Sequence, residues 1–136
     1  MPLYLDELLQ AYEGEIAGEV YFKTLSCAFP EPGHQKKLML LAEVERRTWK
    51  TLHPLITRYG LKPSDSVALT TRGEKSAKER DFPRWSDLME AAGPDEDKSA
   101  LKALVEHEVA LLSFAERETA GDTDSLSLVR QYLIRT

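Results

Sequence analysis

The sequence predicts an all-α fold: an antiparallel four-helix bundle with a long crossover connection and a short C-terminal helix. Two long stretches near the N-terminus and one nearer the C-terminus carry apolar residues every three or four positions, and turn-forming residues separate them. The chain has 136 residues, of which 42% are hydrophobic and 30% charged. This is enough to bury one core, so we expect a single domain over residues 1–136.

The first two helices are expected over residues 3–28 and 35–59. The apolar face of the first comprises Leu5, Leu8, Leu9, Tyr12, Ile16 and Val20. Residues 30–33 contain two prolines and a glycine, which end this helix and permit a tight reversal, so the second helix should run antiparallel to the first. Gly60 is placed as the C-terminal cap of the second helix, and Pro54 should kink it.

The remaining chain predicts a connection and three further helices. Residues 60–83 are polar and show no sustained period, so we expect a long connection that crosses over between two parallel helices. Residues 84–92 predict a short helix, and residues 95–119 a long amphipathic one. A last short helix over residues 125–135 is expected to cap the bundle or to pack on another subunit.

Composition excludes several classes of function. The net charge is −5 and the lysines and arginines are scattered, so no nucleic-acid partner is expected. Cys27 is the only cysteine, which excludes an internal disulfide framework and a thiolate metal cage and is typical of a reducing compartment. The N-terminus lacks a basic region followed by an apolar run, and no segment is long and apolar enough to span a bilayer. We therefore expect a cytoplasmic protein with no membrane partner.

Glutamates on the inward helix faces are the residues that suggest chemistry. On a helical wheel, Glu19 lies near the centre of the apolar stripe of the first helix and Glu15 on its edge. Glu45 and Glu108 are central in the second helix and in the helix over residues 95–119, and His107 is marginal. A buried carboxylate is costly unless it is paired, protonated or bound to a cation, and no arginine or lysine shares these faces.

Two interpretations of these carboxylates remain open. They are ligands of a metal ion such as iron or manganese, which carboxylates on facing helices bind in bundles. Alternatively no metal is bound, and tyrosines, the Thr48 hydroxyl, water and a shared proton satisfy them, with raised carboxyl pKa values. A faint repeat links two of the helices, because Leu41–Glu45 is echoed by Leu104–Glu108.

Tyr12–Phe22 and Leu41–Thr48 resemble the first two helices of the rubrerythrin branch of the ferritin-like superfamily, and the resemblance covers residues 4–58. It implies a ferritin-like bundle with a carboxylate site for two iron or two manganese ions. In that family the first helix supplies a glutamate, which corresponds to Glu15 or, alternatively, to Glu19.

The second and fourth helices of the family each supply a Glu-x-x-His motif. Glu45 and Glu108 match the two glutamates, but Thr48 and Leu111 stand at the histidine positions. The resemblance therefore implies three metal ligands, which are Glu45, Glu108 and either Glu15 or Glu19, about half of the roughly six ligands of a complete site. Whether His107 replaces a lost ligand stays open.

Two functions follow as expectations. The first is a ferritin-like bundle with a partly degenerate carboxylate metal site, metal-free or weakly metal-binding, that serves as a binding or accessory module. The alternative is a rubrerythrin-like di-iron or di-manganese oxidoreductase that acts on oxygen or peroxide. The short C-terminal helix further suggests a homodimer, because its apolar side needs a surface to cover it.

Overall fold

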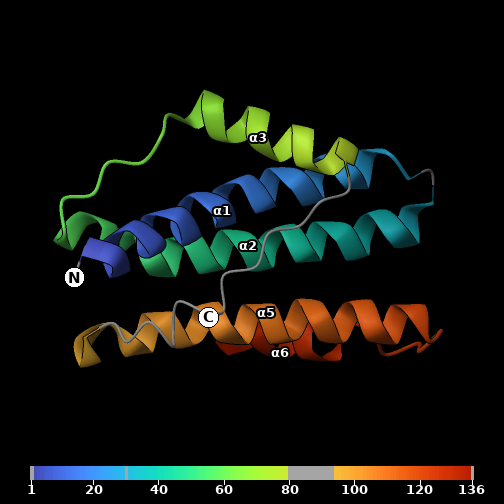
Figure 1. The fold of residues 1–136 in the computed structure, drawn as a ribbon. Helices are drawn as coiled ribbons and strands as arrows, with labels where there is room; N and C mark the ends of the chain where they lie inside the picture. Colours follow the sequence, from blue (N-terminus) through green and yellow to red (C-terminus); the bar gives the residue numbers. More distant parts are fainter. Residues whose placement is uncertain (1, 30, 80–93, 136) are drawn as a thin grey trace.

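The structure is a computed structural model that describes residues 2–29, 31–79 and 94–135. Its elements are α1 (Pro2–Cys27), α2 (Pro32–Arg58), α3 (Ser66–Glu79), a 3-10 turn (Asp95–Asp97), α5 (Lys98–Thr119) and α6 (Ser127–Arg135) (Figure 1). Every regular element in these ranges is helical, so the predicted all-α class is confirmed. No helix in the described ranges is long and apolar enough to cross a membrane.

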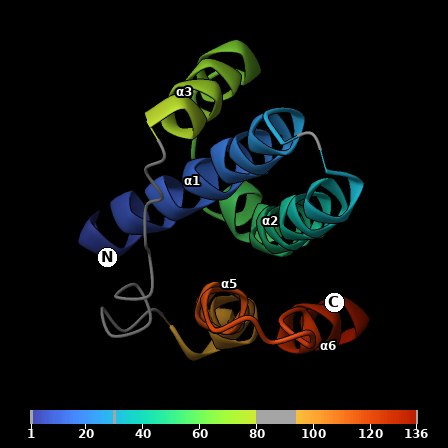
Figure 2. The same ribbon diagram turned by 90° about the vertical axis from the view of Figure 1, so that its right-hand side faces the viewer.

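The helices form three layers. Figure 2 shows α1 and α2 as an antiparallel pair, with α5 and α6 beneath them and α3 above α1. Contacts join α2 to both α5 and α6, whereas α3 packs against α1. Helix α1 is thus covered by protein on two opposite sides.

The core has two apolar clusters. One contains Leu8, Leu52, Leu101 and Leu104, each at most 1% exposed. The other contains Val44 and Val129, which are both fully buried, and extends toward the opposite end of the bundle. Burial of each such side chain stabilises the fold by about 1.5 to 3 kcal/mol. On α1, α2 and α5 the boundary between the clusters falls near the middle of the helix.

Two glycines follow helix ends, Gly60 after α2 as the sequence predicts and Gly121 after α5. Gly60 has φ +61° and Gly121 has φ +74°, a backbone conformation that other residues adopt at a cost. After α2, the Gly60 N–H donates to Thr57 O at 3.1 Å and the Leu61 N–H to Ile56 O at 3.0 Å. This pair of bonds is a Schellman motif, and it satisfies carbonyls that the end of the helix leaves without a partner.

The prediction of a long connection over residues 60–83 is wrong, because this stretch contains α3. The inward side of α3 is Leu69, Gly73 and Ala77, spaced one turn apart, and only the first is large. A Cβ on Gly73 would lie 2.4 Å from Ala17 O, so the glycine allows the two backbones to approach closely. A helix that packs through small residues shows little apolar periodicity in its sequence.

The other helices follow the expected ranges with small differences. Helix α2 begins at Pro32, three residues earlier than predicted, because proline is tolerated in the first turn, where its missing N–H has no partner to lose. The helix continues through Pro54 to Arg58. The short helix expected over residues 84–92 lies outside the described residues. Helix α6 packs on α5 and α2 of its own chain, which covers Val129 and Tyr132.

Candidate metal centre

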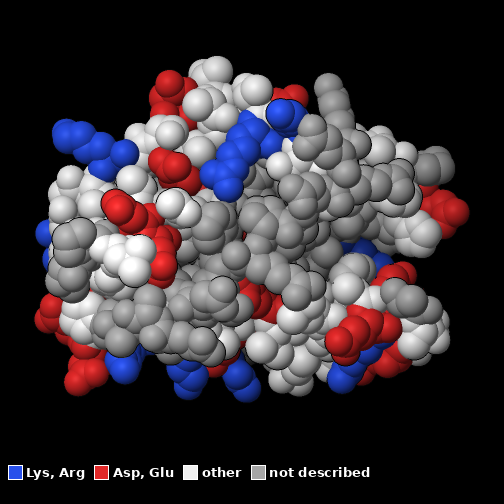
Figure 3. All heavy atoms as spheres, viewed as in Figure 1, with Lys and Arg blue, Asp and Glu red and all other residues white. Residues whose placement is uncertain are grey.

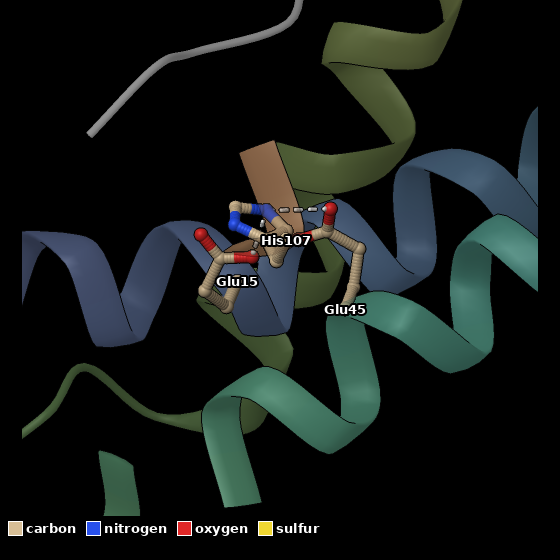
Figure 4. Close-up of side chains that lie close together, drawn as sticks. All are labelled: Glu15, Glu45 and His107. Carbon is tan, nitrogen blue, oxygen red and sulfur yellow. Dashed lines mark hydrogen bonds and ion pairs between the residues drawn. The ribbon is translucent and has the colours of Figure 1, made fainter. Parts of the chain in front are cut away.

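Two glutamates and one histidine, each from a different helix, meet inside the bundle. Glu15 comes from α1, Glu45 from α2 and His107 from α5, and one ligand atom of each lies within 4.8 Å of the others. Each residue is 1% exposed. Figure 4 shows the two carboxylates pointing toward the imidazole ring from their separate helices. On each helix the residue lies where the two apolar clusters adjoin, so the group is enclosed at both ends by hydrocarbon.

The imidazole has a defined orientation. His107 Nδ1 lies 2.7 Å from the carbonyl oxygen of Leu104, one turn earlier on α5. A carbonyl can only accept, so Nδ1 carries a proton and donates it there. The other nitrogen, Nε2, faces the carboxylates, at 3.0 Å from Glu15 Oε2 and 3.1 Å from Glu45 Oε1. Hydrogen bonds from Nδ1 to a backbone carbonyl commonly fix metal-binding histidines in this way.

The Glu15 carboxylate is incompletely satisfied. Its Oε2 atom is fully buried and has no hydrogen-bond partner among the residues that the structure describes. The 3.0 Å approach of His107 Nε2 gives it charge attraction, while the hydrogen bond of Nε2 goes to Glu45. A buried acceptor without a hydrogen bond is costly, which makes this oxygen a candidate ligand atom.

The three groups perturb one another strongly. Burial raises the pKa of Glu45 well above its usual value, and the neighbouring Glu15 carboxylate raises it further. Burial would also raise the pKa of Glu15, but the charge of His107 lowers it overall. Burial opposes the charged imidazole, yet the two carboxylates raise the pKa of His107 well above its usual value. Without a metal, these shifts favour the proton-bearing forms of Glu45 and His107 beside the ionised form of Glu15.

Space for the Glu45 carboxylate depends on Gly18. A Cβ on Gly18 would lie 2.7 Å from Glu45 Oε2 and 3.0 Å from its Cδ, closer than real contacts of this kind. The absence of a side chain on α1 thus lets the carboxylate of α2 lie directly against the α1 backbone. This glycine is a functional feature that the sequence analysis missed.

The Thr48 hydroxyl makes its contacts outside the group of three residues. This residue lies one turn after Val44, and its hydroxyl donates to Val44 O at 2.7 Å. The same hydroxyl is paired with the Tyr132 hydroxyl of α6. Burial raises the pKa of Tyr132 to about 12, so it stays protonated. The pairing joins α2 to α6.

The structure brings together two of the four residues that the sequence analysis proposed as metal ligands, Glu15 and Glu45. Glu19 lies outside the group, where it accepts hydrogen bonds from Trp49 Nε1 at 2.9 Å and from Lys23 Nζ at 2.6 Å. Glu108 is buried at 7% exposure but also lies outside the group and lines a neighbouring pocket.

The expected positions of Glu15, Glu19 and His107 on their helix faces are therefore corrected. The wheel failed on α1 because α3 covers the side opposite the bundle, so the apolar residues of α1 do not define one inward direction. On α5, His107 is central rather than marginal, and it supplies the cation that these faces were expected to lack. The sequence did indicate that His107 faces inward, since Leu104, His107 and Leu111 are spaced by three and four residues.

The donor set suits a transition metal. Two carboxylates and one neutral imidazole would compensate the charge of a divalent ion, and mixed oxygen and nitrogen donors are typical of iron, manganese and zinc sites. Comparisons with known proteins add no assignment, because no family model, curated protein or solved structure matches the chain. The geometry of these three residues therefore carries the functional argument.

Proposed function

We propose that Glu15, Glu45 and His107 hold one transition-metal ion, iron or manganese, in a ferritin-like helical bundle that serves as a weakly metal-binding or accessory module. The observation that carries the proposal is the convergence of three fully buried ligand groups from three separate helices. Such a group is expensive to bury, and binding of a cation is one of the few ways to offset that cost.

The orientation of each side chain supports the proposal. Because Nδ1 of His107 donates to Leu104 O, Nε2 is the nitrogen available to a metal. Glu15 Oε2 and Glu45 Oε1 are the carboxylate oxygens nearest to it, at 3.0 and 3.1 Å. A bound divalent ion would replace the protons on Nε2 and Glu45 and would give Glu15 Oε2 a partner.

The same contacts argue for one ion and for modest affinity. A complete two-metal site in a ferritin-like bundle uses about six side chains, two of them histidines. Here Thr48 and Leu111 stand at those two histidine positions, and Thr48 is paired with Tyr132. Protons compete directly with a metal for Nε2 and Glu45, so affinity should be weaker at lower pH.

The second candidate function is an oxidoreductase that acts on oxygen or peroxide. It is favoured by the number of protein ligands, because three leave coordination positions for exchangeable molecules. Bound iron or manganese would supply the redox chemistry. The chain itself would exclude bulk water through its two apolar clusters.

Metal stoichiometry tests the proposal. Full-length protein is titrated anaerobically with Mn²⁺ or Fe²⁺ and analysed for metal after desalting and by calorimetry. We expect one ion per chain in the wild type, and loss of at least about tenfold in affinity in Glu45→Gln and His107→Gln. Glu19→Gln is the matched control, because Glu19 lies on α1 outside the group.

Two results would contradict the proposal: no binding at millimolar metal, or an equal loss of affinity in Glu19→Gln and Glu45→Gln. Two ions per chain would favour the two-metal interpretation instead. Peroxide turnover by the metal-loaded wild type, absent in His107→Gln, would decide for the oxidoreductase.

A further inference from the structure

An apolar pocket lies farther along the bundle from the metal centre. Its volume is about 350 Å³. It is lined from three helices by Tyr21, Phe22, Leu25, Leu38, Leu41, Glu108, Leu111, Leu112, Phe114 and Ala115. Nine of these ten side chains are aliphatic or aromatic. A pocket of this size and character is typical of sites that bind small molecules.

The pocket and the centre share the same three helices. Leu41 lies one turn from Glu45 on α2, and Leu111 lies one turn from His107 on α5. The pocket is nevertheless formed by its own residues, and none of the three metal-binding side chains lines it. Occupation of the pocket therefore does not depend on metal.

The lining defines the chemistry of the ligand. Glu108 is the single charged residue among the ten, it is 7% exposed, and it already has an interaction partner in the chain. An anionic ligand would be repelled by this carboxylate and would lose its own hydration. A cationic ligand would also have to give up water in a space otherwise walled by hydrocarbon. An uncharged apolar molecule meets neither cost.

We propose that this pocket binds an uncharged apolar small molecule, about the size of a substituted aromatic ring. The size follows from the volume, since an apolar cavity of roughly 150 Å³ already holds benzene. The aromatic rings of Tyr21, Phe22 and Phe114 and the leucine side chains provide the contacts. This site is separate from the metal centre, and the two proposals are tested independently.

The test is methyl NMR of full-length, metal-free protein with ¹³C-labelled leucine methyl groups, titrated with ethylbenzene. Five leucines line the pocket, so their methyl resonances report binding directly. We expect saturable shifts at Leu38, Leu41 and Leu111. The methyls of Leu8 and Leu52, in the other apolar cluster, are the internal control and should not move.

Two variants place a bulky ring in the pocket. Leu111→Trp fills its interior, and Leu112→Trp fills it from a position that is 41% exposed, which disturbs folding less. Each should weaken ethylbenzene binding at least about tenfold. Leu3→Trp adds the same ring at a leucine that is 68% exposed and outside the pocket, and should bind as the wild type does.

Charged analogues test the class of ligand. Phenethylamine and phenylacetate have the same ring, and both should bind more weakly than ethylbenzene. The proposal is overturned if the pocket methyls do not shift, if Leu8 and Leu52 shift to the same extent, if Leu112→Trp binds like Leu3→Trp, or if phenethylamine or phenylacetate binds more tightly than ethylbenzene.

Discussion

Replacement of Gly18 by alanine should weaken metal binding much more than it destabilises the fold. The new Cβ would lie 2.7 Å from Glu45 Oε2, 3.0 Å from Cδ and 3.3 Å from Cγ, whereas ordinary contact begins at 3.4 Å. The carboxylate must therefore retreat by about half an ångström or more. It cannot do so freely, because Glu45 Oε1 is hydrogen-bonded to His107 Nε2 and the whole residue is buried.

The magnitudes expected for the site and for the fold differ. Strain from an added methyl group in a packed interior costs about 1 to 3 kcal/mol. The higher helix propensity of alanine returns about 1 kcal/mol. The net loss of stability in Gly18→Ala should thus be about 0 to 2 kcal/mol. Metal sites tolerate displacements of only about 0.2 Å, so the affinity for Mn²⁺ should fall at least tenfold.

The assay combines urea unfolding with Mn²⁺ calorimetry. Gly33→Ala is the matched control, because a Cβ at that glycine of α2 has no neighbour within 4 Å. It should leave metal affinity near wild type and raise stability by at most about 1 kcal/mol, through the higher helix propensity of alanine. Wild-type metal affinity in Gly18→Ala would refute the placement of Glu45, and so would an equal loss in the Gly33→Ala control.

Four further predictions concern the fold, the pH response and assembly. Gly73→Ala should destabilise the protein by about 1 to 3 kcal/mol in urea unfolding, because the clash is with a backbone oxygen at 2.4 Å; an unchanged midpoint would contradict the packing of α3 on α1. Asp97→Asn should cost about 2 to 4 kcal/mol, since this fully buried carboxylate accepts from two tyrosines and an arginine at 2.6 to 2.8 Å; the same unfolding assay measures it. Without metal, stability should fall as pH rises above about 6.5 toward the raised pKa of His107, because a group whose pKa is raised on folding stabilises only while protonated; thermal melts should show a smaller slope in His107→Gln, where the raised pKa of Glu45 alone contributes. The homodimer stays a prediction, which a monomeric mass in analytical ultracentrifugation at micromolar concentration would contradict.

Large amphipathic helices could be predicted from the sequence, and the reasons are visible in the structure. The stripes of α2 and α5 face the core and are interrupted by few polar residues, so the apolar period reports the inward direction. Helix α3 was missed because Gly73 and Ala77 occupy most of its buried side. Two residues without large side chains leave no apolar period, although they permit closer backbone packing than leucines would.

The candidate site could be predicted only in part. Glu45 was placed correctly on the inward side because α2 has one buried face. The helical wheel, however, placed Glu19 nearer the centre of the stripe than Glu15, because α1 is covered from two sides. Gly18 could not be recognised, since its role depends on where Glu45 of another helix lies. Local spacing identifies which residues are buried, but the register between helices decides which buried groups meet.

On the face drawn in Figure 3, surface charge offers no comparable guide to function. Acidic and basic side chains are interspersed over the described part of the face in Figure 3, without a continuous basic surface. Among the described residues, Glu15, Glu45 and His107 instead form a buried group that could hold a metal ion. Experiments should therefore test the positions of these three buried side chains.

Anomalous diffraction from crystals of the full chain grown with Mn²⁺ tests the central claim most directly. Data on the high-energy side of the manganese absorption edge would locate the ion without reference to its ligands. The account predicts one anomalous peak, within bonding distance of His107 Nε2 and of a carboxylate oxygen from both Glu15 and Glu45. No peak at that position, or a peak held by Glu19 or Glu108 instead, would contradict it.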